Sequence, residues 1–167
     1  MKSFGKNRLA KMYRSGPGVC FLLLSVFVWP AFADESDPFA ILRGNWGGSG
    51  TMLLKDGVKE RLICKANYSG SSSQLRLQIN CQSNSNKVNM KARLSANGGR
   101  LLGVWEEETF KALGTIAGKI DEDKITFNIG GNVLGDMVVR YSKSRQDISI
   151  NTKGVALQSI KMRLSRR

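Results

Sequence analysis

Between Val58 and Ser83 the chain alternates between apolar and polar residues with a period of two. The apolar residues at every second position are Val58, Leu62, Cys64, Ala66 and Tyr68 in a first arm and Leu75, Leu77, Ile79 and Cys81 in a second arm. Such alternation is typical of strands with one buried face and one solvated face. Because the turn-forming run Gly70-Ser71-Ser72-Ser73 separates the arms, the stretch predicts a β-hairpin.

The register of this hairpin brings its two cysteines together. With Ser72-Ser73 at the tip, Cys64 lies directly opposite Cys81. The other facing pairs are then Ala66 with Ile79 and Tyr68 with Leu77. A slip of one residue would send the cysteines to opposite faces, so the apolar pattern itself specifies this register. We predict a Cys64–Cys81 disulfide, and the alternative is a pair of reduced, buried cysteines.

Similar short runs follow one another along the rest of the chain. They cover residues 46–54, 88–94, 101–110, 112–120, 125–129, 134–141, 148–150 and 155–164. Lys55-Asp56-Gly57 fits a three-residue hairpin loop that pairs Leu54 with Val58 and keeps both inside. Many short strands with regular turns predict an all-β, up-and-down antiparallel meander of about eight to ten strands. A closed or nearly closed barrel is favoured over a sandwich, because an open meander would leave two long exposed edges.

The first 33 residues have the pattern of a secretory signal peptide. Five basic residues precede an apolar run over residues 19–29, and Ala31-Phe32-Ala33 forms a cleavage signal before Asp34. The apolar run is too short to span a bilayer, so the chain is expected not to be transmembrane after signal removal; an uncleaved anchor is the alternative. The remaining residues 34–167 are predicted to form a single β-barrel domain in the periplasm or outside the cell. Cys20 leaves with the signal, so two cysteines remain in an oxidising compartment.

The residue inventory excludes most catalytic chemistry. The sequence contains no histidine, so serine–histidine and cysteine–histidine arrangements and imidazole metal sites are excluded. It shows neither a P-loop nor a dinucleotide glycine fingerprint. Two carboxylate clusters, at residues 106–108 and 121–123, are the remaining enzymatic option. We read the second cluster as a solvated turn and expect a protein that is not an enzyme and has no cofactor and no metal.

A ligand site is predicted at the mouth of the barrel. Alternation places Glu107 on the same inward face as Trp105, and the candidate ligand-binding residues are Trp46, Tyr68, Trp105 and Glu107. Small inward residues on several strands are compatible with a cavity for one small hydrophobic ligand, and equally with a tightly closed interior. The alternative for Glu107 is a rim position, paired with a lysine or an arginine.

The polar parity of the predicted hairpin and the strand after it is strongly basic. It holds Lys59, Arg61, Lys65, Arg76, Lys87, Lys91 and Arg93, and it holds no acidic residue. Residues 34–167 keep 21 basic and 13 acidic side chains, which gives a net charge of +8. A patch of one sign attracts polyanions, so anionic lipid, lipopolysaccharide or an acidic partner or host protein is the expected partner. Nucleic acid is not expected, because this face lacks aromatic residues for stacking. The alternative is an ordinary solvated face with counter-charges from the two acidic clusters.

Two resemblances add to this reading. Gly44-x-Trp46, before a glycine-rich first strand, resembles the opening of the calycin group. The resemblance implies that Trp46 closes one barrel end beneath a basic residue of a late strand, for which Arg140 and Arg163 are the candidates. The run from Trp46 through Glu60-Arg61, Cys64, Tyr68 and Cys81 to Trp105-x-Glu107 resembles a family of small exported alphaproteobacterial proteins of uncharacterised function. That resemblance implies export, the disulfide and an all-β fold, and it transfers no catalytic residue.

Overall fold

The computed structural model describes residues 37–167, and these residues form ten antiparallel β-strands closed into one barrel. The strands are β1 (Gly44–Leu54), β2 (Lys59–Gly70), β3 (Gln74–Gln82), β4 (Lys87–Asn97), β5 (Arg100–Glu107), β6 (Ala112–Ile120), β7 (Lys124–Gly131), β8 (Leu134–Tyr141), β9 (Arg145–Lys153) and β10 (Leu157–Arg166). The predicted signal peptide lies outside the described residues. In the described part of the chain, no helix has the length and apolar character needed to cross a membrane.

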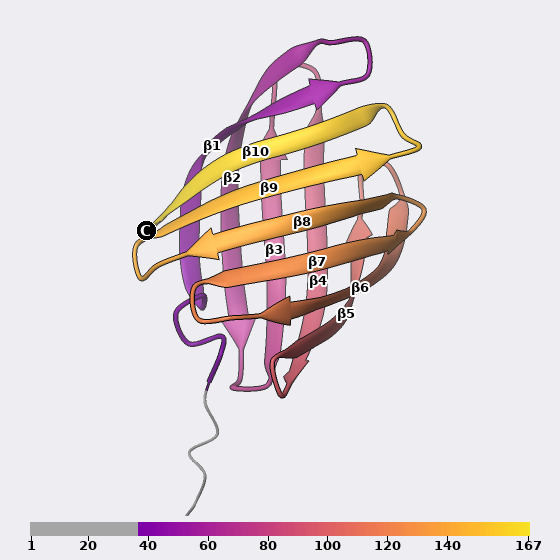
Figure 1. Cartoon of the computed structure of the whole chain (residues 1–167). Helices are drawn as coiled ribbons and strands as arrows, with labels where there is room; N and C mark the ends of the chain where they lie inside the picture. The colour runs from indigo at the N-terminus through magenta and orange to yellow at the C-terminus, as the bar shows by residue number, and fades with distance from the viewer. Residues whose placement is uncertain (1–36) are drawn as a thin grey trace, which may run out of the picture. The chain divides into compact units, whose positions relative to one another are not determined.

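Each strand pairs with its neighbours in sequence, and β1 also pairs with β10. In Figure 1, strands β7 to β10 cross in front of β2, β3 and β4, which run steeply behind them. The predicted all-β, up-and-down meander is therefore confirmed, with ten strands and full closure. Closure leaves no sheet edge with unpaired backbone groups, which is the physical advantage of a barrel over a sandwich.

The predicted hairpin forms with the predicted register. Cys64 pairs with Cys81, Ala66 with Ile79 and Tyr68 with Leu77 across β2 and β3. The two cysteines form a disulfide, and their Cα atoms lie 4.1 Å apart. The inward parity of both strands is thus fixed by apolar pairing and by a covalent bond at the same position.

Barrel closure between β1 and β10 depends on glycine. Gly48 lies opposite Leu164, and a Cβ atom at Gly48 would stand only 1.9 Å from the carbonyl oxygen of Arg163. No residue with a side chain fits so close an approach of two backbones. The dense glycines of β1 therefore have a packing role at the seam of the barrel.

The β1–β2 loop also follows its prediction, with one correction. Gly57 has φ +83°, and the Leu54 amide donates to the carbonyl of Val58 at 2.9 Å, which pairs these two residues as expected. Val58, however, is 45% exposed. It precedes β2 at the rim, where the barrel wall no longer covers an inward side chain.

Candidate functional site

The barrel encloses a cavity of about 460 Å³. Its walls are mainly the aliphatic and aromatic side chains of inward positions, including Met52, Leu62, Ile79, Ala92, Ile116, Phe127, Met137, Ile150 and Met162. Ligand pockets in proteins commonly measure 300–1,000 Å³ and are mostly apolar. The cavity therefore has the size and lining of a small-molecule site.

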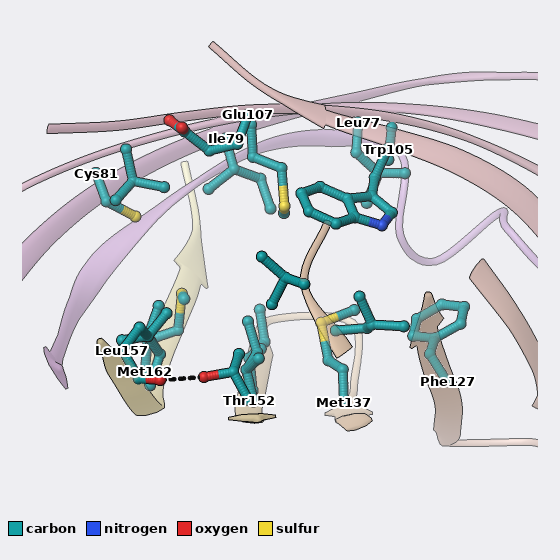
Figure 2. Close-up of a pocket in the computed structure, with 18 of the residues that line it drawn as sticks. Leu77, Ile79, Cys81, Trp105, Glu107, Phe127, Met137, Thr152, Leu157 and Met162 are labelled. Carbon is teal, nitrogen blue, oxygen red and sulfur yellow. Dashed lines mark hydrogen bonds between the residues drawn. The ribbon is translucent and has the colours of Figure 1, made fainter. Parts of the chain in front are cut away.

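Two groups of strands supply opposite walls of this space. Figure 2 shows Leu77, Ile79 and Trp105, from β3 and β5, facing Phe127, Met137 and Met162, from β7, β8 and β10. The Trp105 indole extends from its wall toward the space between them, and its Nε1 donates to the Gly130 carbonyl at 3.2 Å. That hydrogen bond fixes the ring orientation inside the cavity.

One end of the cavity opens among loops. Asn86, Phe110, Val133, Val155 and Ala156 line it there, from the loops that follow β3, β5, β7 and β9. Phe110 is 61% exposed, so this rim is in contact with solvent. We call this end the mouth.

The opposite end is closed by the segment that precedes β1. Phe39 and Leu42 are buried, in a single turn held by a hydrogen bond from the Leu42 amide to the Phe39 carbonyl at 3.0 Å. Arg43 donates to Asp37 at 2.5 Å, and this interaction holds the pKa of Asp37 below its ordinary value. Trp46 is 1% exposed and donates to the Leu42 carbonyl at 2.7 Å. We call this end the blind end.

The basic residue above Trp46 is Arg166. The calycin resemblance implied Arg140 or Arg163, and neither of them takes this position. The Arg166 guanidinium carbon lies 4.4 Å from the centre of the indole ring. Parity explains the correction: Trp46 faces Arg166 across β1 and β10, so both belong to the inward set. Arg163 has the outward parity and donates to Asp147 at 2.6 Å, and Arg140 lies across from Asp147 on that outer face.

Three of the four predicted ligand-binding residues line the same cavity. Tyr68 lies at the blind end, Trp105 in the wall and Glu107 near the mouth. Trp46 lies beneath the cavity floor as part of the closure and does not belong to the lining. The sequence analysis placed the four predicted ligand-binding residues together at the mouth. The structure places them at different positions along the barrel.

Glu107 is buried, with 7% of its surface exposed, and it is satisfied by backbone groups. Its carboxylate accepts hydrogen bonds from the amides of Asn89 at 2.8 Å, Thr109 at 3.1 Å and Phe110 at 2.6 Å. These contacts brace the β5–β6 loop, where Lys111 has a left-handed φ of 53°. The alternative for Glu107, a pairing with a lysine or an arginine, is not found among the described residues, and the three amide donors take its place.

Sequence reasoning missed the polar side chain at the blind end, Gln146. It is 1% exposed, lines the cavity, and its Oε1 accepts a hydrogen bond from the Tyr68 hydroxyl at 3.2 Å. Burial raises the pKa of Tyr68, so the phenol stays protonated and able to donate. The available signal was parity, since Gln146 shares the inward set of β9 with Ile148 and Ile150.

The basic outer face has the composition that the sequence predicted. Its seven members are exposed: Lys59, Arg61, Lys65, Arg76, Lys87, Lys91 and Arg93. Arg76 lies directly opposite Arg93 across β3 and β4. Lys91 forms an ion pair with Glu108, so the acidic cluster at residues 106–108 supplies one of the expected counter-charges.

Comparisons with known proteins find solved structures with a similar fold, but no match in sequence. No family model and no curated protein matches the sequence. The crystal structure of Rv2717c from M. tuberculosis superposes with a TM-score of 0.64 and 14% identity, over 81% of this chain and 98% of that one. The S-type phycobiliprotein lyase CPES from Guillardia theta superposes with a TM-score of 0.53 and 9% identity, over 77% and 89% of the two chains. This chain therefore shares a barrel fold with proteins of very different sequence, while its resemblance to an alphaproteobacterial family stays a prediction.

Proposed function

We propose that this protein is an exported, non-enzymatic binding protein that holds one small apolar or amphipathic molecule inside its barrel. The observation that carries the proposal is the apolar cavity of about 460 Å³, with a closed floor and an open mouth. The fold alone does not assign the activity, because one structure that shares it is named a lyase.

The lining supports binding rather than catalysis. Glu107 is the acidic residue of the cavity wall, and its oxygens already accept three backbone hydrogen bonds. A general acid or base must reach the reacting atom of a substrate, and a carboxylate engaged in this way is poorly placed to do so. Export to the periplasm or the medium follows from the predicted signal peptide, and it is part of the proposal.

A ligand screen by thermal shift and native mass spectrometry tests this function on a chain that begins at residue 34. Lipids and small hydrophobic molecules that bind the folded barrel should raise its melting temperature and add the mass of one ligand. Ala92→Phe places a ring in the cavity and should abolish this binding, whereas Ala117→Phe adds the same ring on the outer face of β6 and should preserve it. Failure of every apolar probe to bind would reject the proposal.

A second candidate function uses the barrel as a scaffold for its basic outer face. The specific observation is the direct Arg76–Arg93 pair on neighbouring strands. Like charges directly opposite one another destabilise a sheet, and a bound anion would relieve that repulsion. The expected occupant is an anionic envelope component, such as lipopolysaccharide or anionic phospholipid, or the acidic surface of a partner or host protein.

Chromatography on a polyanion column distinguishes this function from an ordinary solvated face. Reversal of Lys65, Arg76 and Lys91 to glutamate should abolish retention at low salt. The matched control reverses Lys119, Lys124 and Arg140, on strands β6, β7 and β8, and so gives the same net charge. Equal elution of the two triple variants would show that overall charge, and not this face, determines retention.

A further inference from the structure

The blind end of the cavity holds one polar group that the fold leaves unused. Gln146 Nε2 is buried and has no hydrogen-bond partner within the described residues. The other amide atom, Oε1, accepts from the Tyr68 hydroxyl at 3.2 Å. Gln146 thus lines a space that is otherwise lined mainly by hydrocarbon, and its buried N–H donor has no acceptor among the described residues.

A buried donor without an acceptor destabilises a folded protein, since it has lost its hydrogen bonds to water. An apolar side chain at this inward position of β9 would avoid that cost, as Ile148 and Ile150 do further along the strand. The position of Gln146 is consistent with an acceptor that arrives from outside the chain. The cavity that the amide lines leads to the mouth, so such an acceptor has a route to it.

The surroundings of Gln146 select the chemistry of that acceptor. The cavity lining includes no lysine and no arginine, and its one carboxylate, Glu107, lies toward the mouth. Arg166 lies on the far side of Trp46, where it donates to the carbonyls of Ile41 and Arg43. An ionised head group at the blind end would lose its hydration without gaining a counter-charge, which is strongly unfavourable. An uncharged oxygen acceptor meets no such cost.

We propose that the ligand is a neutral amphiphile that enters polar end first, with a carbonyl, ester or ether oxygen accepting a hydrogen bond from Gln146 Nε2 and an apolar tail filling the barrel toward the mouth. This inference rests on the proposed binding function and specifies its ligand class. Tyr68 orients the amide by donating to Oε1, so that the N–H group stays directed at the ligand. Tyr68 and Gln146 together form the polar anchor of the site.

The test compares probes that differ in the head group alone. Methyl decanoate, dodecane and decanoate are offered to the folded barrel, and their dissociation constants are measured by displacement of the neutral fluorophore N-phenylnaphthylamine. Gln146→Met keeps the side-chain volume and removes the amide. The ratio of ester affinity to alkane affinity should fall about tenfold in this variant. Ionised decanoate should bind the unsubstituted protein at least about tenfold more weakly than its methyl ester.

The matched control is Gln78→Met, which makes the same replacement on the outer face of β3 and should leave the ratio unchanged. A measurement on the unsubstituted protein keeps the test valid if Gln146→Met fails to fold. The side-chain amide resonances of Gln146 should shift with methyl decanoate and much less with dodecane. Probes that bind with the same ester-to-alkane ratio in both proteins, or with unmoved amide resonances, would overturn the anchor and leave the binding function intact. Absence of binding by all three probes would overturn both.

Discussion

The Arg166 guanidinium lies over the indole ring of Trp46, 4.4 Å from its centre. The same group donates from Nη1 to the carbonyl of Arg43 at 2.8 Å and from Nη2 to the carbonyl of Ile41. One side chain near the end of β10 therefore joins the last strand to the segment that precedes the first. This contact closes the blind end of the barrel and keeps the cavity floor in place.

Replacement of Arg166 by alanine should reduce the free energy of unfolding by about 2–3 kcal/mol, because it removes charge-assisted hydrogen bonds and a cation–π contact. Arg166→Lys should recover only a part of the loss, since an ammonium group lacks the planar fork that reaches two carbonyls and a ring together. Urea denaturation followed by tryptophan fluorescence measures both variants. Arg167→Ala removes the same charge from the neighbouring residue, and an equal effect there would show that charge, not the contact, is responsible.

Loss of the disulfide should destabilise the barrel without changing its fold. The bond links residues 17 apart in sequence, and the chain-entropy treatment assigns a loop of that size about 3 kcal/mol. The Cys64→Ala, Cys81→Ala double variant should therefore have a free energy of unfolding lower by about 3 kcal/mol, and its urea midpoint should fall accordingly. Addition of a reductant should shift the unsubstituted protein to the same midpoint and leave the variant unaffected. Identical midpoints for the oxidised protein and the variant would contradict the prediction.

Replacement of Glu107 by glutamine should destabilise the β5–β6 loop. Three backbone amides donate to the carboxylate, and an amide side chain presents two N–H groups and only one oxygen to those donors. We expect a loss of about 1–3 kcal/mol, measured by urea denaturation, with faster hydrogen exchange at Thr109 and Phe110. Glu106→Gln, on the outward face of β5, should have little effect. Loss of a hydrolytic activity on Glu107→Gln, with stability unchanged, would instead support the enzymatic option that the carboxylate cluster at residues 106–108 left open.

Alkaline pH should unfold the barrel as its tyrosines ionise. Tyr68 and Tyr141 are the only tyrosines after residue 33, and both have a raised pKa. Burial is the cause at Tyr68 and the first cause at Tyr141, where the carboxylates of Asp123 and Asp121 add to it. Because the folded state prefers the neutral phenol, its stabilisation is complete below about pH 10 and is lost as pH rises above that value.

Absorbance of tyrosinate and circular dichroism, recorded together against pH, check this linkage. Ionisation in the folded protein should lag behind that in urea, and the loss of β-structure should accompany it. The free energy of unfolding of Tyr68→Phe and of the unsubstituted protein is compared with its own value at pH 7. On that scale, the loss of stability should begin at a higher pH in Tyr68→Phe. Ionisation of both tyrosines near pH 10 with the barrel intact would show that these phenols are accessible to water.

The sequence predicted local features of this fold well where pairing partners are close in the chain. The β2–β3 register followed from alternation alone, because a one-residue shift would expose every apolar residue of the hairpin. The residue above Trp46 was assigned incorrectly, since Arg140 and Arg163 were chosen without the β1–β10 register that makes Arg166 its partner. Gln146 was overlooked for a related reason: its parity was readable, but its contact with Tyr68 joins residues 78 apart in sequence.

The order of apolar and polar residues by itself determined the strands, most of their inward positions, the facing of Cys64 with Cys81 and the basic outer face, because each depends on a period of two and on short turns. Tertiary structure alone decided that the interior is a cavity, that one end is blind, and that Gln146 lies at its floor. Those properties depend on how ten inward faces meet around a closed circumference and on where residues 37–43 pack. A local pattern of residues does not contain that geometry, which emerges only when β1 meets β10.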